Sequence, residues 1–215
     1  MKLTAQERAM IATTVAALEA RTGAQVVAAV VGKADSYPEA PWKAFALGAS
    51  AAAPALALWQ LVGNGWVADS ALAAHVLIIP GSGALLALLA TLFLPVARLF
   101  VDRARREGEV MQFAQALFFR RGMDRTHARV GILLLVSLFE RRVVILADEG
   151  FDGRIAASDW QALTSRITLL LPHAGTASAV RAGLDAMLAL LLERGYRGPG
   201  AGNELPDMLE LKDAR

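Results

Sequence analysis

The sequence predicts a small α/β/α sandwich with a mixed sheet, interrupted by a two-helix transmembrane hairpin. The hairpin is predicted because, of 22 basic and 20 acidic residues, only Asp69 and Arg98 lie between Ala44 and Val101. The sandwich is predicted because helical patterns alternate with short apolar, β-branched runs on both sides of that block. The expected segments are 1–36 for the first helix and strand, 43–100 for the hairpin, 101–197 for the remainder of the domain and 198–215 for a tail.

The first helix is expected over residues 4–22. Thr4 and Glu7 have capping-box spacing, and apolar residues then recur at helical intervals. Because this segment carries charges and has no central apolar run, it is not typical of a cleaved signal peptide. Gln25–Val31 follows as a short apolar run, which is typical of a strand buried on both faces.

The apolar block divides into two uncharged runs, 44–68 and 70–97. Each exceeds the roughly 20 residues that a helix needs to cross the hydrocarbon core of a membrane. Glycines at 63 and 65 predict the turn between them. The alternative is a buried hairpin in a soluble protein, but a domain this small would scarcely enclose two helices that are apolar all round.

Basic residues flank the block and are absent from its central loop, which predicts a cytoplasmic location for both termini. The chain is therefore expected to be integral to the inner (cytoplasmic) membrane, with two spans and the lipid bilayer as a partner. His75 is expected near the outer end of the second span as an interfacial residue rather than a proton relay. The flanking basic residues are Lys33, Lys43, Arg98, Arg103, Arg105 and Arg106.

After the block, an amphipathic helix is expected over 101–121, either separate or as a continuation of the second span. Runs 130–139 and 142–147 predict two strands joined tightly as an antiparallel hairpin, so the sheet is expected to be mixed. Ser158 is expected to cap a helix that reaches residue 170 and stops before Pro172. A last helix is expected over 176–194, followed by an extended tail.

The richest polar cluster follows the third strand, where Asp148, Glu149 and Asp152 lie among glycines. Clustered carboxylate oxygens are the ligands that Ca²⁺ and Mg²⁺ prefer, which predicts a divalent metal site. The spacing is not that of an EF-hand. The alternative is an acidic loop that solvates a turn and caps the next helix.

A second cluster precedes the second strand and predicts either a phosphate or lipid-headgroup site or a solvated basic turn near an anionic membrane face. A net charge of +2 gives no indication of nucleic-acid binding, and the absence of cysteine excludes disulfides, thiolate metal sites and a cysteine nucleophile. Walker, dinucleotide-binding and Gly-x-Ser-x-Gly motifs are absent, and His127 and His173 lack the spacing of a zinc site. The cluster comprises Arg120, Arg121, Asp124, Arg125, His127 and Arg129.

Four parts of the sequence resemble the TPM domain family, in particular a bacterial branch with a membrane hairpin after the first strand. They are the run Arg-Thr-Gly-Ala-Gln-Val-Val at 21–27, the strand pair with its acidic loop at 131–150, Trp160, and Asn-Glu-Leu-Pro-Asp at 203–207. The resemblance implies an α/β sandwich domain on a membrane-associated protein. It also implies a family of mixed activity, which includes a thylakoid lumen acid phosphatase linked to photosystem repair and an auxiliary protein of acetylcholine receptors.

The resemblance further implies calcium binding at Asp148, Glu149 and Asp152. The chain departs from the family here, because Ala-Asp-Glu-Gly at 147–150 replaces a common Gly-x-Gly-Leu-Glu version. The leading hypothesis is a membrane-anchored accessory or quality-control factor of a membrane protein complex. The alternative is a divalent-metal-dependent phosphatase at the cytoplasmic membrane face.

Overall fold

The computed structural model describes residues 3–62, 69–126, 128–198 and 208–211. The chain forms two compact units, one of residues 1–36 with 107–215 and the other of residues 37–106. The predicted turn at 63–66, His127 and the tail motif at 203–207 lie outside the described residues.

The first unit contains a four-stranded mixed sheet of order β3-β2-β1-β4. β1 (Gln25–Val31) pairs in parallel with β2 (Gly131–Ser137), which pairs antiparallel with β3 (Arg142–Ala147). These pairings confirm the mixed sheet and the antiparallel hairpin. The tail adds an edge strand that the sequence did not predict, because β4 (Met208–Leu211) pairs in parallel with β1.

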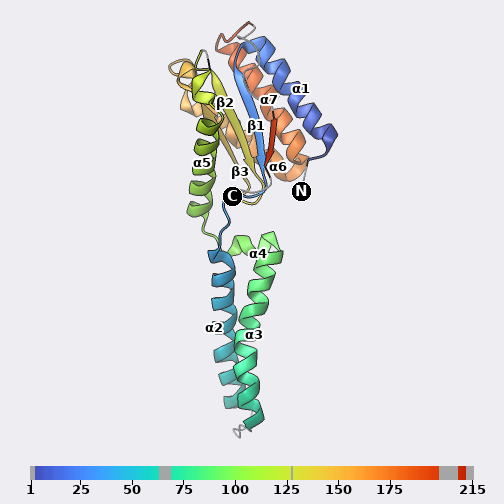
Figure 1. Cartoon of the computed structure of the whole chain (residues 1–215), viewed down its shortest axis with the longest axis vertical. Coiled ribbons are helices and arrows are strands. Elements are labelled where there is room, and N and C mark those ends of the chain that lie inside the picture. Colours follow the sequence, from blue (N-terminus) through green and yellow to red (C-terminus); the bar gives the residue numbers. More distant parts are fainter. Residues whose placement is uncertain (1–2, 63–68, 127, 199–207, 212–215) are drawn as a thin grey trace. The chain divides into compact units, whose positions relative to one another are not determined.

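Helices cover both faces of this sheet (Figure 1). α1 (Ala5–Thr22), α6 (Ala157–Ala174) and α7 (Thr176–Glu193) pack on the face that carries Val26 and Leu134. α5 (Arg103–Arg120) packs on the opposite face, against Val27 and Leu135. Every residue of β1 and β2 is buried, as expected of strands covered on both sides. The α/β sandwich predicted from the sequence is confirmed.

The capping box predicted for α1 is present. The backbone N–H of Glu7 donates to the Thr4 hydroxyl at 3.2 Å, and the Glu7 carboxylate accepts from the backbone N–H of Thr4 at 2.7 Å. These hydrogen bonds hold the pKa of Glu7 below its ordinary value.

The predicted start and end of α6 were wrong. The helix begins at Ala157, and Asp159 accepts from the backbone N–H of Ala156 at 3.2 Å, whereas Ser158 lies inside the first turn. The helix also continues through Pro172 to Ala174. Proline removes one backbone hydrogen bond and kinks or ends a helix, but contacts with neighbouring elements can offset this cost, and here α7 follows directly and packs against α6.

The second unit contains α2 (Glu39–Val62), α3 (Asp69–Leu92) and the short α4 (Leu94–Leu99). α2 and α3 approach closely, because a Cβ atom added at Gly48 would lie 2.7 Å from the carbonyl oxygen of Ser82. The Ser82 hydroxyl donates to the carbonyl of Gly48 at 3.1 Å. The chain breaks between α3, α4 and α5, so the helix after the apolar block is separate from the second predicted span.

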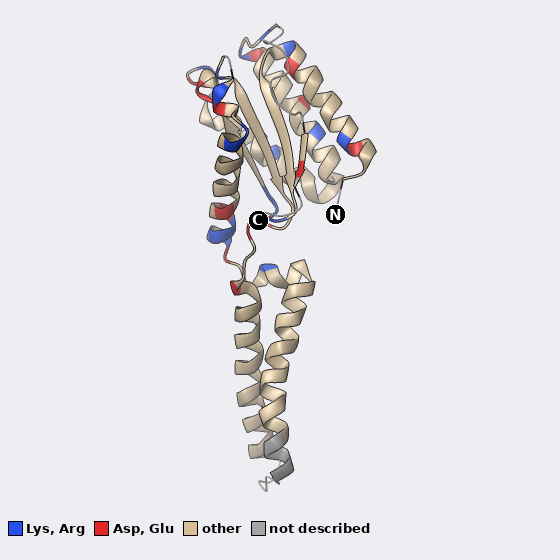
Figure 2. Cartoon of the chain, in the orientation of Figure 1, with Lys and Arg blue, Asp and Glu red and all other residues tan. Residues whose placement is uncertain are grey.

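α2 and α3 are long and apolar enough to cross a membrane. Figure 2 shows how few charged residues they carry. None of the most apolar stretch of α2 is buried, and only 11% of that stretch of α3 is. Trp59 and Leu61 are 78% and 82% exposed. This exposure is unlike that of a core helix in a soluble protein, which was the alternative interpretation of the sequence.

Candidate functional site

The loop after β3 carries the three carboxylates that the sequence singled out. Asp148 begins the short turn η2 (Glu149–Phe151), accepts from the backbone N–H of Glu149 at 2.9 Å, and has a side chain only 5% exposed. Glu149 and Asp152 are exposed. All three line one cavity of about 300 Å³. The loop therefore combines one buried carboxylate with two that solvent reaches.

Arg129 joins this cavity from the segment before β2. Its Nη2 donates to Oδ1 of Asp148 at 3.0 Å, and its Nε lies 2.9 Å from Oδ2 of the same carboxylate. A second ion pair, 3.2 Å long, joins Nη2 to Glu149. Arg129 also adopts a φ of 54°, a conformation that is uncommon for residues other than glycine. The guanidinium thus lies between two of the predicted metal ligands.

The register of the hairpin explains why Arg129 reaches the acidic loop. Ile132 of β2 pairs with Ala147 of β3, so the residues before β2 lie beside the residues after β3. Asp124 and Arg129 of the basic cluster therefore meet the acidic loop at one end of the sheet, although the two clusters are separate in the sequence. The antiparallel hairpin was itself predicted, so this meeting was implicit in the sequence.

The same register brings in Asp124, which was not predicted as a ligand. Asp124 lines the cavity with Asp148 and Arg129. Its Oδ1 is buried without a hydrogen-bond partner, and the buried Oδ2 of Asp148 has only its ion pair with Arg129. Hard cations bind such oxygens, so the donor chemistry fits a cation. In the present arrangement, however, no three acidic or histidine side chains among the described residues converge closely enough to hold a metal ion.

An aromatic cluster holds the acidic loop in place. Phe151 is buried against Trp160 and Tyr196, with ring centroids 5.9 and 4.9 Å away. The Tyr196 hydroxyl donates to the carbonyl of Gly150 at 2.8 Å. Burial raises the pKa of Tyr196, and the nearby Arg154 partly offsets this, so the hydroxyl remains a donor at neutral pH.

Of the other described members of the basic cluster, Arg120, Arg121 and Arg125 do not line the cavity. Arg120 and Arg121 are exposed at the end of α5, and the Arg125 side chain is 84% exposed, 3.9 Å from Asp124. His173 is exposed in the last turn of α6. His75 contacts Gln60 of α2, with 3.0 Å between Gln60 Nε2 and His75 Nδ1.

Comparison with known families supports the resemblance seen in the sequence. Residues 90–190 match the family model of the TPM domain. The matched part contains β2, β3 and the acidic loop, whereas α1 and β1 precede it. No curated protein matches the chain.

The fold is similar to that of a solved structure, the NMR structure of the BA42 protein from the psychrophilic bacterium Bizionia argentinensis. The two align with a TM-score of 0.57 and 14% sequence identity, over 100% of this chain and 97% of that one. At this identity the similarity concerns the fold alone.

Proposed function

We propose that the chain is a membrane-anchored accessory or quality-control factor of a membrane protein complex. The premises are that residues 90–190 match the TPM domain and that two helices are able to cross a membrane. The observation that carries the proposal is the exposed apolar surface of α2 and α3. In water, such a surface would drive aggregation. In a bilayer it is stable, and the domain is held at the membrane.

The anchor is proposed to lie in the inner membrane with both termini in the cytoplasm. The basic residues at its ends favour this orientation. Single cysteines test it cleanly, because the chain has no native cysteine. A membrane-impermeant maleimide added to intact cells is expected to label Gly65→Cys but not a cysteine appended to the C-terminus. Labelling of the C-terminal cysteine from outside would overturn the orientation.

A role beside a larger membrane complex is supported by the anchor together with the lack of familiar enzyme motifs in the sequence. The test is crosslinking and affinity purification of the full chain from native membranes. A specific membrane protein should copurify, and it should be lost when residues 44–97 are replaced by an unrelated helical hairpin. Purely monomeric behaviour in native membranes would contradict the role.

The second candidate is a divalent-metal-dependent phosphatase at the cytoplasmic membrane face, favoured by the buried, unpartnered Oδ1 of Asp124 in the cavity that the Asp148 carboxylate also lines. Asp148 and Asp124 would hold Ca²⁺ or Mg²⁺ together with Glu149 or Asp152. The bound cation would neutralise the charge of a phosphate ester. Because Arg129 already pairs with Asp148, its guanidinium would have to give way to the cation.

Calorimetric titration of the full chain in lipid nanodiscs with Ca²⁺ or Mg²⁺ tests the site directly. Binding should disappear in Asp148→Asn and weaken in Glu149→Gln. Asp185→Asn is the matched control, because Asp185 is exposed on α7 and pairs only loosely with Arg181, at 4.0 Å. Cation binding that survives Asp148→Asn, or no cation binding at all, would exclude this site.

A further inference from the structure

A second cavity, of about 400 Å³, lies at the opposite end of the sheet from the acidic loop. It is lined by Ser137 and Leu138 at the end of β2, Arg141 in the β2–β3 turn, Thr168, Leu171 and Pro172 of α6, and Thr176 of α7. Its volume is in the range of small-molecule sites. Because β1 and β2 are parallel, their carboxyl ends meet here, where open α/β sheets commonly bind ligands.

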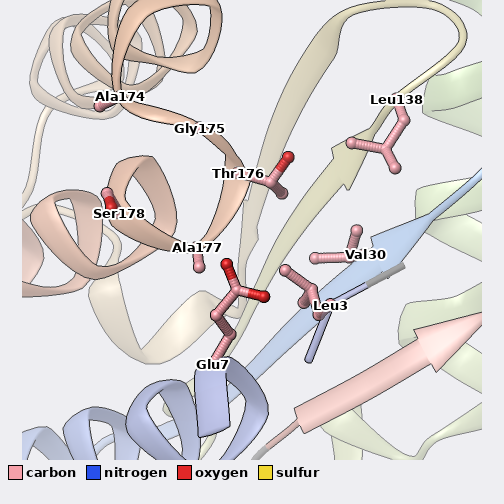
Figure 3. Close-up of a pocket in the computed structure, with 9 residues that line it drawn as sticks. All are labelled: Leu3, Glu7, Val30, Leu138, Ala174, Gly175, Thr176, Ala177 and Ser178. Atoms are coloured by element: carbon pink, nitrogen blue, oxygen red, sulfur yellow. The ribbon is translucent and has the colours of Figure 1, made fainter. Parts of the chain in front are cut away.

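Thr176 contributes a polar side chain to this cavity. The residue is only 7% exposed, it lines both this cavity and a smaller adjoining one of about 60 Å³, and its hydroxyl has no hydrogen-bond partner among the described residues. The hydroxyl oxygen is not one of the fully buried, unpartnered side-chain atoms of the described residues, so it is open to the cavity, where a ligand or water can bind it. Figure 3 shows this hydroxyl beside Leu138.

Thr176 is also the first residue of α7, an 18-residue helix that begins without a side-chain cap. The first backbone N–H groups of a helix have no partner inside it, and together they carry a partial positive charge. Those of Thr176 and Ala177 are buried beside the two cavities. The start of α7 therefore offers donors to a negatively charged group.

Arg141 adds a full positive charge to the large cavity. Its side chain has no ionic or hydrogen-bond partner within the described part of the chain, and its φ of 53° is strained for an arginine. Such strain is found more often at functional sites than elsewhere. The neighbouring Glu140 is buried and engaged, since it accepts from the backbone N–H of Ala34 and from the Ser137 hydroxyl.

The Glu7 carboxylate also opposes an anion at this position. Glu7 extends from α1 toward the first turn of α7 and lines the smaller cavity, as Figure 3 shows. It already interacts with Thr4. Removing the charge of Glu7 should therefore favour the binding of an anion, and this effect can be used to test the site.

We propose that the cavity at the carboxyl ends of β1 and β2 binds a small amphiphilic anion, a phosphate monoester or carboxylate with a short apolar chain. The charged group would lie between Arg141 and the start of α7. The apolar chain would lie against Leu138, Leu171 and Pro172.

The test is calorimetric titration of the full chain, in phosphatidylcholine nanodiscs, with n-butyl phosphate and with butyrate, using empty nanodiscs as the blank. Saturable binding of at least one of the two is expected. Inorganic phosphate and n-butanol should each bind more weakly, because each lacks one half of the ligand. If inorganic phosphate binds as tightly as butyl phosphate, the apolar part of the proposal is wrong. The absence of saturable binding of both amphiphiles would overturn all of it.

The binding affinities of single-residue variants test where the ligand binds. Arg141→Gln should weaken binding about tenfold, the typical effect of losing a charge-assisted hydrogen bond. Thr176→Val should also weaken it, and Glu7→Gln should strengthen it. Arg166→Gln is the matched control, because Arg166 is exposed on α6 and does not line the cavity. Arg141→Gly should weaken binding as well. Because glycine accepts a positive φ without strain, loss of binding in this variant would not result from a misfolded turn.

Two further experiments distinguish this site from other sites on the protein and identify the source of the ligand. Asp148→Asn, at the other end of the sheet, should leave binding unchanged, and loss of binding in that variant would contradict the proposal. Competition of butyl phosphate with phosphatidic acid in the nanodisc would assign the site to a lipid headgroup. Unchanged affinity would assign it to a soluble molecule. If the Arg141, Thr176 and Glu7 variants all bind the ligand with the affinity of the wild type, the site is excluded.

Discussion

Gly150 illustrates how a single small residue allows the acidic loop to meet the segment before β2. A Cβ atom added at Gly150 would lie 2.5 Å from the carbonyl oxygen of Arg129 and 2.8 Å from that of Ala128. The backbone N–H of Gly150 donates to that same Arg129 carbonyl at 2.9 Å. Glycine is required here by a close approach of backbone to backbone rather than by its φ.

Gly150→Ala is therefore expected to lower the free energy of unfolding by about 1–3 kcal/mol, the usual effect of forcing a methyl group into a packed site. The ion pair between Arg129 and Asp148 should loosen as the loop moves away. Gly108→Ala is the control, because Gly108 is an exposed residue of α5 and no atom outside its own helix backbone lies within 4 Å of a Cβ atom added there. There the added methyl group should stabilise the helix by up to about 1 kcal/mol. Thermal unfolding measures both, and an equal effect of the two substitutions would contradict the argument.

Glu7 makes stability depend on pH in a defined direction. Hydrogen bonds from Thr4 lower the pKa of Glu7 in the folded chain relative to the unfolded one. The resulting stabilisation is present above the pKa of unfolded glutamate and is lost as the pH falls through the lower folded value. The thermal midpoint of Glu7→Gln should thus vary less with pH than that of the wild type over this acidic range. Parallel pH profiles would show that the capping box contributes no linkage.

At the scale of the elements, the contact between α2 and α3 depends on small residues. Besides Gly48, Gly83 lies so close to α2 that an added Cβ atom would be 2.8 Å from the carbonyl oxygen of Phe45. Gly81, two residues earlier, has no atom of the neighbouring helix within 4 Å of such a Cβ. Small residues of this kind let membrane helices pack closely.

Gly83→Val is expected to push the helices apart, whereas Gly81→Val should leave them in place. Cysteines at Gln60 and His75, whose side chains are in contact, report the separation. With Gly83→Val, oxidative crosslinking of Gln60→Cys to His75→Cys should slow markedly compared with the same pair carrying Gly81→Val. Equal crosslinking rates would mean that the two helices do not need this contact.

The sequence predicted the elements whose pattern is local and missed those that depend on partners. The short continuous apolar run Gln25–Val31 predicted a strand buried on both faces, and β1 is that strand. β4 was missed because Met208–Leu211 is short and is stabilised mainly by pairing with β1 and by contacts of Glu210 with Leu3 and Arg8, which are distant in sequence. The start of α6 was misplaced because two residues, Ser158 and Asp159, both suit a helix start and only the fold selects between them.

The candidate site was predicted in part for a similar reason. The carboxylates of the acidic loop were evident from their spacing alone. The ion pair with Arg129 and the contribution of Asp124 required the register of the β2–β3 hairpin. The cavity at the other end of the sheet was not predicted, because its lining combines the end of β2 and the β2–β3 turn with residues of α6 and α7, which come later in the sequence.

At the scale of the whole molecule, the apolar hairpin is an insertion in the sequence of the sandwich, and its described residues are not members of the two hydrophobic clusters around the sheet. Both hydrophobic clusters around the sheet are built only from residues of the first unit. All four strands belong to that unit as well. The core of the sandwich and the two candidate membrane helices are therefore formed by different parts of the chain.

This division predicts that the sandwich folds without its anchor. Replacing residues 37–101 with a flexible linker of about 20 Gly and Ser residues should give a water-soluble protein, because the entropy of closing a loop rises only slowly with its length. The cut keeps Asp102, whose carbonyl accepts the backbone N–H of Arg106 at the start of α5. Circular dichroism should show mixed α/β structure and one cooperative transition. The full chain should remain in the membrane after carbonate extraction, whereas the shortened one should stay in the supernatant. An unfolded or aggregated product would mean that the sandwich depends on the hairpin for its fold.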